Sequence, residues 1–545
     1  MLQIKNLTLT HKKDLHTLVE DFSLTLNPGD RAVMIGEEGN GKSTLLKWLY
    51  DPELIEDYIE AEGERVLAGE RLSYLPQELP AADAEKSVYD YFASDPLFFE
   101  KSPRELAAAA ARLSMPQDFF YREQRMDTLS GGERVRAALL KVLLEDPSVL
   151  LLDEPSNDLD IRTLELLEKL ISGFSGIVLY ISHDETLIEN TANMVVHLEQ
   201  LRHKTMPRFT VSRLSYRDYV EQRESKMEHQ EEMARSDRRE KKIRDEKFRR
   251  IQEKVEANLL DPSHSMHDAL GRLAKKKMHA VKSMGRRFER EDRDMTEFPE
   301  TEEAIFFKLG TEKSRMPQGK TVIEYSLEKL YAGSGAETET KENGSGSQAE
   351  NLPEQGKLLS RAVFLRVRGP EKVCMVGDNG CGKTTLLRKI VESMEERTDL
   401  RYEYMPQNYE DLLDFSRTPV DILDRSGSKE ERTRIRTYLG AMKFTAEEMD
   451  HPAGELSGGQ KAKLFLLKMS MSDANLLTLD EPTRNFSPLS GPVIRALLRA
   501  FPGAIIAVSH DRKFIREVCT RVLKLTPEGL VPYEDGTEKD SIKEG

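Results

Sequence analysis

The stretch GEEGNGKSTLL at residues 36–46 returns in altered form as GDNGCGKTTLL at residues 377–387. Both match the pattern G-x-x-x-x-G-K-[ST], in which a glycine-rich turn between a strand and a helix surrounds phosphate oxygens with backbone amides. One such stretch by itself can be a simple glycine-rich turn, but here the complete motif occurs twice in the same context. We therefore expect two phosphate-binding loops in one chain.

The bulk composition bounds the class of protein. The 545 residues are too many for one hydrophobic core and suggest about three or four domains. No apolar run approaches the roughly 18–20 residues that span a bilayer, and the start MLQIKNLTLT lacks the organisation of a signal peptide. We therefore expect a cytoplasmic protein with no membrane segment. Cys374, Cys381 and Cys519 are too few for a disulfide framework or a paired Cys-x-x-Cys metal site, and we expect reduced thiols.

Charge is distributed unevenly along the chain. The whole sequence carries a net charge of −15. Residues 235–287 contain 17 Lys and Arg against eight Asp and Glu, a local charge of +9, so the remainder carries −24. The basic surface is therefore concentrated in one segment.

The two halves form a repeat of domain size. The first half contains, in order, YLPQE (74–78), LSGGERVRAALLKVLLEDPSVLLLDEP (129–155) and YISHD (180–184). The second half contains the corresponding stretches in the same order and at similar spacing: YMPQN (404–408), LSGGQKAKLFLLKMSMSDANLLTLDEP (456–482) and AVSHD (507–511). Short apolar runs such as RAVMIG (31–36), SVLLLD (148–153) and IVLYIS (177–182) alternate with helix-like stretches and predict buried parallel strands. Each half therefore predicts an α/β domain.

The connector between the halves predicts a helical hairpin. Residues 212–296 lack strand-like alternation and are rich in good helix formers. We expect one helix over 212–258, a break in LLDPSHS (259–265) because Pro262 cannot continue a helix, and a second helix from about Met266 to Arg293. Apolar residues at three- and four-residue spacing predict the seam of an antiparallel pair. These residues are Phe248, Ile251, Val255 and Leu259 on the first helix and Val281, Met284 and Phe288 on the second.

Three parts follow from this pattern. We expect a first nucleotide domain over residues 1–211, a hairpin linker over 212–296 and a second nucleotide domain over 297–545. Residues 333–356, rich in Gly, Ser and Glu, predict a disordered insertion in the surface of the second domain.

The residue types of both loops suit a nucleoside triphosphate bound with Mg²⁺. The loop lysine reaches the β- and γ-phosphates, and the hydroxyl that follows it ligates the metal ion. The candidate residues of the first loop are Gly36, Gly39, Asn40, Gly41, Lys42, Ser43 and Thr44. Those of the second loop are Gly377, Gly380, Cys381, Gly382, Lys383, Thr384 and Thr385.

Paired carboxylates end a buried strand in both halves, in LLLDEP and LLTLDEP. We expect Asp153 and Asp480 to bind Mg²⁺ through water, and Glu154 and Glu481 to polarise the attacking water. Ordinary surface acids would not follow directly on an apolar strand.

Glutamine and histidine complete each set. Gln77 and Gln407 have the chemistry to sense the metal ion and water, and His183 and His510 have the chemistry to contact the γ-phosphate. A single residue of this kind is more often structural. Its placement in two complete sets favours a functional role.

The motifs together resemble the ATP-binding cassette family, with LSGGE (129–133) and LSGGQ (456–460) similar to its signature. The resemblance implies ATP held between the phosphate loop of one domain and the signature of the other, so that one nucleotide state closes the halves and hydrolysis opens them. A serine hydroxyl and glycine amides at a helix N-terminus suit a γ-phosphate. The site on Lys383 would be completed by Ser130, Gly131, Gly132 and Glu133, and the site on Lys42 by Ser457, Gly458, Gly459 and Gln460.

Two cassettes and a charged helical connector in one chain resemble the ABC-F subfamily, whose members act on ribosomes. The resemblance implies a monomer that pairs its own cassettes, occupies the tRNA exit site when closed by ATP, and extends the linker toward the peptidyl-tRNA and the peptidyl transferase centre. YRDY (216–219) resembles the entry to that linker. Ribosome protection against antibiotics and a housekeeping role in translation are both implied. A transporter's ATPase subunit and a DNA-directed ATPase are alternatives from other classes.

The hairpin's charge agrees with a nucleic-acid partner such as rRNA. Basic side chains can contact many phosphates and make binding dependent on salt. The candidates are Arg238, Arg239, Lys241, Lys242, Arg249, Arg250, Lys275, Lys276, Lys277, Arg286 and Arg287, and the candidate tip residues are Leu259, Leu260, His264, Met266 and His267. The alternative is a solvated helical spacer whose charges pair at i,i+4.

A departure from the subfamily pattern in the second half predicts unequal sites. Subfamily members usually continue LDEP with TNHLD, whereas this chain has SNDLD at 156–160 and TRNFSPLS at 483–490, which puts Ser487 in place of the expected aspartate. Tyr331 is a candidate for stacking on adenine in the second site, and His11 is a weaker candidate in the first.

Overall fold

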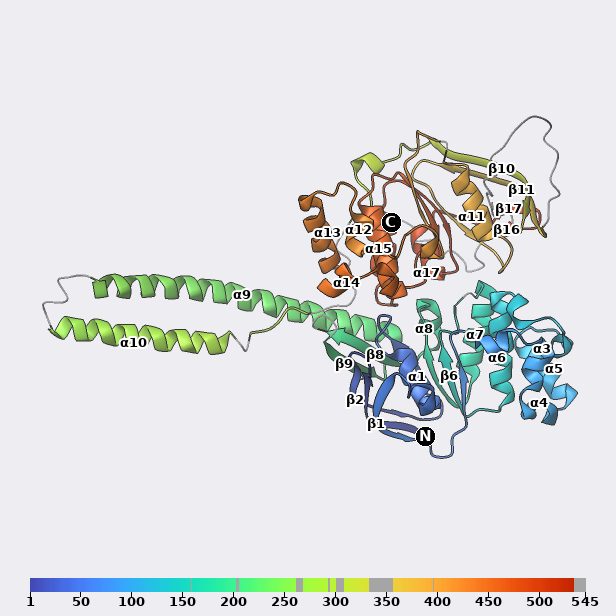
Figure 1. Cartoon of the computed structure of the whole chain (residues 1–545), viewed down its shortest axis with the longest axis horizontal. Helices are drawn as coiled ribbons and strands as arrows, with labels where there is room; N and C mark the ends of the chain where they lie inside the picture. The colour runs from blue at the N-terminus through green and yellow to red at the C-terminus, as the bar shows by residue number, and fades with distance from the viewer. Residues whose placement is uncertain are drawn as a thin grey trace, which may run out of the picture. The chain divides into compact units, whose positions relative to one another are not determined.

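The computed structural model divides into two compact units. Residues 217–301 form one unit, and residues 1–216 with 302–545 form the other. The residues that the structure describes are 1–157, 159–201, 205–260, 268–292, 295–299, 308–332, 356–395 and 397–533. Figure 1 shows the elements of each unit.

The first cassette is built on a six-stranded sheet in the order β5-β6-β7-β3-β8-β9. These strands are β5 (Leu72–Leu75), β6 (Val149–Asp153), β7 (Ile177–Ile181), β3 (Arg31–Ile35), β8 (Met194–Leu201) and β9 (Met206–Ser212). All neighbours run parallel except β8 and β9. Every residue of β6 and β7 is buried, as expected for parallel strands covered on both faces.

Helices and a second, smaller sheet complete this cassette. The antiparallel sheet has the order β2-β1-β4, with β2 (Thr17–Leu26), β1 (Leu2–His11) and β4 (Ile59–Val66). The helices are α1 (Lys42–Tyr50), α2 (Ala81–Ala84), α3 (Val88–Ala93), α4 (Pro96–Glu100), α5 (Pro103–Arg112), α6 (Gly131–Leu144), α7 (Ile161–Gly173) and α8 (Glu185–Thr191). The apolar residues of α1 pack with both sheets into one core.

The second cassette repeats the main sheet in the order β13-β14-β15-β12-β16-β17. These strands are β13 (Tyr402–Met405), β14 (Leu476–Asp480), β15 (Ala504–Val508), β12 (Lys372–Val376), β16 (Arg521–Thr526) and β17 (Gly529–Pro532); β10 (Thr321–Tyr331) and β11 (Leu358–Arg368) pair separately. Its helices are α11 (Lys383–Glu392), α12 (Pro419–Leu423), α13 (Lys429–Ala441), α14 (Ala446–Asp450), α15 (Gly458–Ser470), α16 (Gly491–Ala500) and α17 (Arg512–Val518). The sequence prediction of two α/β cassettes is confirmed.

The linker unit contains two long helices, α9 (Tyr216–Leu260) and α10 (Asp268–Glu291). The Phe248 and Phe288 rings meet edge to face with centroids 5.5 Å apart, and Val255 and Val281 are buried, so these residues form the predicted seam. Ile251 is 42% exposed, and its predicted place in the seam is wrong. A two-helix seam is narrow, and its heptad spacing from Phe248 to Val255 leaves Ile251 outside.

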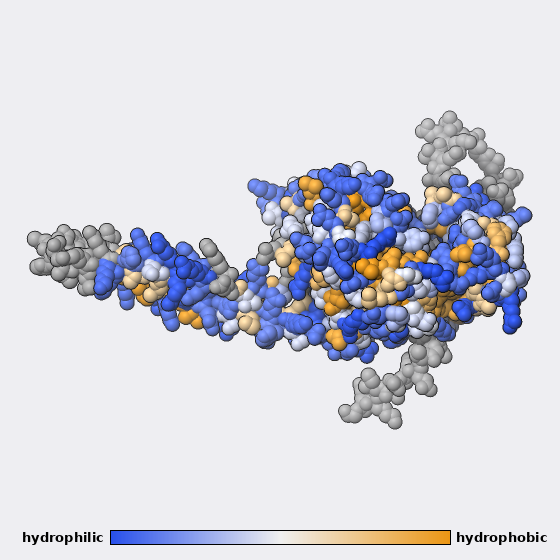
Figure 2. All heavy atoms as spheres, turned by 90° about the horizontal axis from the view of Figure 1, so that it is seen from below, coloured by the Kyte–Doolittle hydropathy of each residue, from blue (hydrophilic) through white to orange (hydrophobic). Residues whose placement is uncertain are grey.

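Some predictions fall outside the described residues. These are residues 261–265 of the predicted turn with His264, the tip residues Met266 and His267, the side chains of Leu259, Leu260 and Lys275, and nearly all of the insertion at 333–356. On the face seen in Figure 2, the described part of the hairpin is predominantly hydrophilic. None of the helices in the described ranges combines the length and apolar character required to cross a membrane.

Candidate functional site

Each phosphate loop closes around its own lysine. Lys42 Nζ donates hydrogen bonds to the carbonyls of Gly36 at 2.9 Å and Glu37 at 2.7 Å. Lys383 Nζ makes the same two contacts with the first two residues of its loop, at 2.8 and 3.0 Å. Both lysines are buried. The two ammonium groups are therefore held over their loops, where a triphosphate would lie.

Glycine at the start of the first loop is required by two features of the backbone. Gly36 has a φ of 139°, in the region that side chains rarely adopt. A methyl group added there would lie 2.2 Å from the carbonyl oxygen of Leu198. The close approach of the loop to β8 therefore depends on the missing side chain.

The carboxylate at the end of β6 is fixed by two hydroxyl groups. Ser43 Oγ donates to Asp153 Oδ1 at 2.9 Å, and Tyr74 OH donates to Asp153 Oδ2 at 3.1 Å. Burial raises the pKa of Asp153. Tyr74 was not singled out from the sequence, although the same position carries Tyr404 in the repeated YxPQ pattern, which was the available signal.

The corresponding Asp480 at the end of β14 fits a cation. Both of its carboxylate oxygens are buried and have no hydrogen-bond partner among the described residues. Burial raises its pKa. An unpartnered buried carboxylate is costly unless a cation or water compensates it. The described residues contain no cluster of three His, Cys, Asp or Glu side chains that could hold a metal ion, but Mg²⁺ needs only one or two carboxylates when phosphates supply further oxygens.

Both candidate catalytic glutamates lie on a strained turn. Glu154 has a φ of 49° and Glu481 a φ of 51°, values uncommon for residues with side chains. The backbone amide of each donates to the neighbouring strand, at 3.1 Å to Ile181 and 2.9 Å to Val508, which holds the turn in place. Strain of this kind gathers at functional sites, and nothing in the sequence pattern signalled it.

Glu154 is surrounded by polar partners. His183 Nε2 lies 3.3 Å from its Oε1, and Gln77 Nε2 donates to its Oε2 at 3.1 Å. Burial raises the pKa of Glu154, but His183, Asn157 and Lys42 outweigh burial and lower that pKa to about 2. The structure therefore brings together the acid, the histidine and the glutamine proposed for the first site, and keeps the acid ionised.

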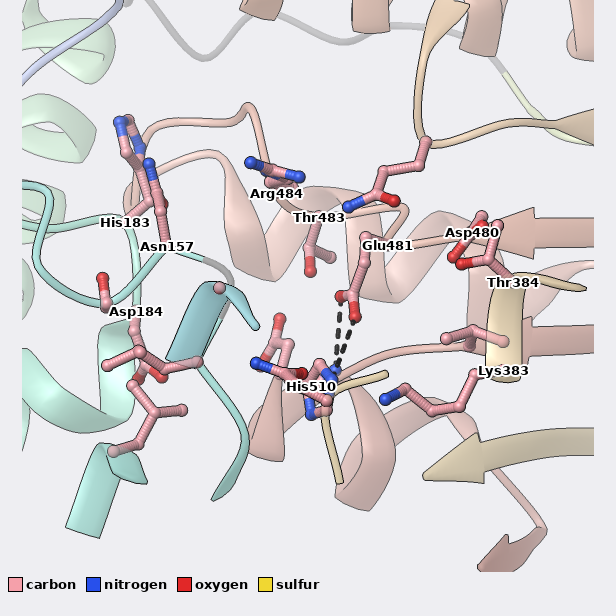
Figure 3. Close-up of a pocket in the computed structure, with 18 of the residues that line it drawn as sticks. Asn157, His183, Asp184, Lys383, Thr384, Asp480, Glu481, Thr483, Arg484 and His510 are labelled. Atoms are coloured by element: carbon pink, nitrogen blue, oxygen red, sulfur yellow. Dashed lines mark hydrogen bonds and ion pairs between the residues drawn. The ribbon is translucent and has the colours of Figure 1, made fainter. Parts of the chain in front are cut away.

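Glu481 has a drier environment. Its Oε2 accepts hydrogen bonds from the backbone amide of His510 at 3.2 Å and from Ser509 Oγ at 3.3 Å. Burial and the charge of Asp480 raise the pKa of Glu481 to about 8, while burial and Lys383 lower the pKa of His510 to about 3. Figure 3 shows Glu481 and His510 side by side, with Lys383 nearby. The pKa values of the two acids are thus shifted in opposite directions.

A cavity of about 580 Å³ joins the second phosphate loop to the first signature. It is lined by Lys383, Thr384, Gln407, Asp480, Glu481 and His510 from one cassette and by Gly131, Ser156, Asn157 and His183 from the other. Ala332, the residue after β10, contributes to this lining, whereas Tyr331, the candidate for stacking on adenine, does not. His11, the candidate in the first site, packs against the ring of Tyr58.

The signatures begin the helices α6 and α15. Ser130 and Glu133 form a reciprocal capping box at α6, and Ser457 and Gln460 do so at α15. The Gly459 amide donates a hydrogen bond across to the first loop. Each signature therefore faces the phosphate loop of the other cassette.

The irregular loop at 483–490 reaches the first site. His183 Nδ1 lies 2.7 Å from the carbonyl oxygen of Phe486. This contact fixes the histidine ring from the opposite cassette, so its Nε2 is directed at Glu154. The sequence predicted an unusual loop here but not this contact.

A buried ion cluster also joins the cassettes, and sequence reasoning missed it. Arg495 of α16 donates through Nη1 to Glu185 Oε1 at 2.6 Å and through Nη2 to Oε2 at 3.2 Å. Lys513 Nζ contacts the same carboxylate at 2.9 Å, and Arg512 pairs with Glu168. Arg495 is 3% exposed and Glu185 is 7% exposed. No local pattern marks charges that pair across more than 300 residues of sequence.

Comparisons with known proteins agree with this architecture. The family model described as ABC transporter matches residues 19–157 and 361–484. The chain is 28% identical to the protein YdiF of Bacillus subtilis, covering 99% of this chain and 83% of the relative. It is 28% identical to the energy-dependent translational throttle protein EttA of Haemophilus influenzae (96% and 92%), and 27% identical to the ATP-binding protein Uup of Escherichia coli (92% and 77%).

Solved structures share the tandem fold. The archaeal ribosome recycling factor aABCE1, in its complex with ribosomal stalk protein aP1, aligns with a TM-score of 0.55 at 18% identity, covering 97% of this chain and 91% of that one. A structure described as RNase-L Inhibitor aligns with a TM-score of 0.54 at 17% identity, with the same coverage. From the two matched cassettes, the duplicated phosphate loops and signatures, and relatives similar over nearly the whole chain, we conclude that the protein belongs to the ATP-binding cassette family, as an ATPase of its ABC-F subfamily.

Proposed function

We propose that this ATPase acts on the bacterial ribosome. In its ATP-closed form it occupies the tRNA exit site and directs the hairpin toward the peptidyl transferase centre, where the hairpin contacts rRNA and peptidyl-tRNA. The observation that carries the proposal is the basic surface of the hairpin. The names of EttA, a translational throttle protein, and of the recycling factor aABCE1 support the same partner.

The basic side chains of the hairpin fall into two groups. Some neutralise acids of the hairpin itself: Lys241 pairs with Asp292 at 2.8 Å, Arg249 with Glu253 at 3.5 Å and Arg287 with Glu291 at 3.2 Å. Others are exposed and have no acidic partner among the described residues, namely Arg239, Lys242, Arg250, Lys276, Lys277 and Arg286. A pure spacer with balanced i,i+4 pairs would not leave this surplus. The second group is therefore free to bind phosphates.

The cassettes supply the nucleotide-driven step. At each site the loop lysine binds the β- and γ-phosphates, and Ser43 with Asp153, or Thr384 with Asp480, would hold Mg²⁺. When bound, Mg²⁺ neutralises charge on the β- and γ-oxygens. Glu154, whose pKa is lowered by His183, Asn157 and Lys42, orients the attacking water at the first site. Closure brings the opposite signature to the γ-phosphate, and removal of that phosphate by hydrolysis releases the halves.

We further propose that the protein is a cytoplasmic monomer that protects ribosomes and so confers antibiotic resistance. The long helical connector supports this role. A housekeeping translation factor is the second candidate, favoured by the similarity to EttA over 96% of the chain.

The ribosomal partner is tested with a chain trapped in the closed form. The double variant Glu154→Gln, Glu481→Gln lacks both acids and should sediment with ribosomes in ATP. The same variant carrying Lys42→Ala and Lys383→Ala is the control, because it lacks both phosphate-binding lysines. Equal recovery of both proteins in the ribosome-free fraction would refute the proposal.

The role of the hairpin is tested by salt dependence. Replacing Arg239, Lys242 and Arg250 with Gln should reduce the slope of log K against log salt by roughly 0.7 to 0.9 for each phosphate that the variant no longer binds. The matched control replaces Lys241, Arg249 and Arg287 with Gln, since these three side chains already have acidic partners. An unchanged slope in the first variant would contradict a phosphate-binding hairpin.

Protection is separated from housekeeping by expression in a susceptible host. We expect raised inhibitory concentrations for at least one class among pleuromutilins, lincosamides, streptogramins, macrolides and phenicols. Unchanged values for all of them, in cells where the protein sediments with ribosomes, would favour the housekeeping role.

A further inference from the structure

The two phosphate loops differ at the position that faces the opposite signature. Aligning the loops pairs Glu38 with Asn379. Glu38 Oε2 accepts a hydrogen bond from the backbone amide of Gly459 at 2.8 Å. The Asn379 Nδ2 lies 3.4 Å from the place where a methyl group on Gly132 would be. Equivalent positions thus meet equivalent glycines, but one brings a carboxylate and the other an amide.

The carboxylate lies directly against the second signature. A methyl group added at Gly458 would lie 2.9 and 3.1 Å from the two oxygens of Glu38. The side chain therefore reaches the N-terminus of α15 only because the signature carries glycines there. Glu38 is partly buried in this contact.

A second charged contact supports the first. Glu37, the preceding residue of the loop, forms an ion pair with Lys463 of α15, which is 4% exposed. The second site is different, because Asp378 pairs at 3.8 Å with Lys524 of its own cassette. The residue that aligns with Lys463 is Arg136, which donates to the carbonyl of Gly132 within its own helix. The charged cross-cassette pair is thus seen at the first site and not, among the described residues, at its counterpart.

The Gly459 amide, which donates its hydrogen bond to Glu38, is one of the donors expected to bind the γ-phosphate. Amides at a helix N-terminus favour anions, because the helix dipole adds to the hydrogen bond. A carboxylate and a phosphate oxygen cannot both accept the same short hydrogen bond, and at that separation their charges repel. Either effect weakens the binding of a nucleotide that carries a γ-phosphate and does not affect the binding of one that lacks it.

We propose that Glu38 is a specificity-determining residue of the first ATP site, where its carboxylate competes with the γ-phosphate for the Gly459 amide. The first site therefore prefers ATP over ADP less strongly than the second site does, and the chain carries a built-in order of ATP loading. This inference rests on the assignment of the two composite sites made above.

The test measures ATP and ADP affinity separately at the first site. In the full chain, Lys383→Ala disables the second site, and calorimetric titration with a non-hydrolysable ATP analogue and with ADP gives both dissociation constants. Adding Glu38→Gln, which keeps the side-chain length, or Glu38→Asn, which copies the second site, should tighten the ATP analogue about 10-fold. ADP affinity should stay within about twofold, because ADP lacks the phosphate that competes.

The reciprocal change provides an independent arm. In a chain with the first site disabled by Lys42→Ala, Asn379→Glu should weaken the binding of the ATP analogue about 10-fold and leave the affinity for ADP nearly unchanged. A general distortion of either loop would alter both nucleotides together, so the ratio of the two affinities is the decisive quantity. Thermal unfolding checks that each variant remains folded.

The outcomes are distinguishable. The proposal is supported if the ratio of ATP affinity to ADP affinity is raised in both Glu38 variants and lowered in Asn379→Glu. If the Lys383→Ala parent binds both nucleotides but the Glu38 variants leave the ratio of ATP to ADP affinity unchanged, the role of Glu38 is overturned and the site assignment stays intact. Failure of the Lys383→Ala parent to bind either nucleotide overturns the assignment of the first site itself, and the inference with it.

Discussion

Removal of one charge from the buried cluster between the cassettes should weaken their closure. The perturbation is Glu185→Gln, which keeps the shape of the side chain and removes its charge. In the folded chain, Arg495 donates to both oxygens of Glu185, and Lys513 donates to one of them. The variant leaves the buried Arg495 and the partly buried Lys513 facing a neutral amide.

The magnitude follows from the burial of the pair. Breaking a buried ion pair by removing one partner costs about 3–5 kcal/mol. Arg495 keeps a contact with Glu517 at 2.8 Å, so we expect the lower end, about 3 kcal/mol. At about 1.4 kcal/mol per factor of ten, the equilibrium constant for closure falls roughly 100-fold.

Steady-state ATP hydrolysis reports this weakening. Because catalysis needs both cassettes at each composite site, weaker closure should raise the half-saturating ATP concentration by up to about 100-fold. The matched control is Glu189→Gln, since Glu189 also contacts Lys513, at 2.6 Å. The side chain of Glu189 is 20% exposed, so its ion pair with Lys513 contributes about 1 kcal/mol or less. The double variant Glu185→Gln, Arg495→Met should recover most of the closure, because no unpaired arginine remains.

A shift below about twofold in Glu185→Gln, or one equal to that of Glu189→Gln, would refute the reasoning. It would mean that the buried cluster does not contribute to the closed form that hydrolyses ATP. Thermal unfolding of each variant separates weakened closure from a decrease in folded protein.

Three further results are expected. Gly36→Ala should abolish nucleotide binding at the first site, measured by titration in a chain with the second site disabled, because the added methyl group would lie 2.2 Å from the Leu198 carbonyl oxygen. Ser457→Ala should lower the unfolding free energy by about 1 kcal/mol in urea, because the variant lacks the α15 cap. As pH rises from about 4 to about 6, the stability of Asp184→Asn should increase relative to that of the parent. Burial raises the pKa of Asp184 to about 6, so the contribution of the protonated Asp184 to the stability of the parent is lost as pH rises through that range. A difference between the two unfolding curves that does not change with pH would contradict this last expectation.

Much of the fold could be read from the sequence because its signals are local. Short apolar runs such as 148–153 and 177–182 became the buried strands β6 and β7, shifted by one residue at their ends. Helix-forming composition and apolar spacing predicted α9 and α10, within four residues of the expected N-terminus of α9. The error at Ile251 arose because three- and four-residue spacing defines a broad stripe, while one partner helix covers only a narrow seam.

The candidate site was less completely predictable. The paired motifs supplied the lysines, the acids, the glutamines and the histidines, since each motif carries its chemistry in adjacent residues. Positive φ at Glu154 and Glu481 left no sign in the sequence, because the strain is imposed by hydrogen bonds to the neighbouring strand.

The sequence by itself determined that this protein has two phosphate loops, two parallel sheets and a basic helical hairpin, because periodicity, glycine spacing and local charge are properties of short segments. Only the tertiary structure decided which charges of one cassette meet the other. Glu38 against Gly459, and Glu185 against Arg495, are pairs separated by more than 300 residues. Their contacts depend on how two rigid cores pack together, and no local pattern specifies that packing.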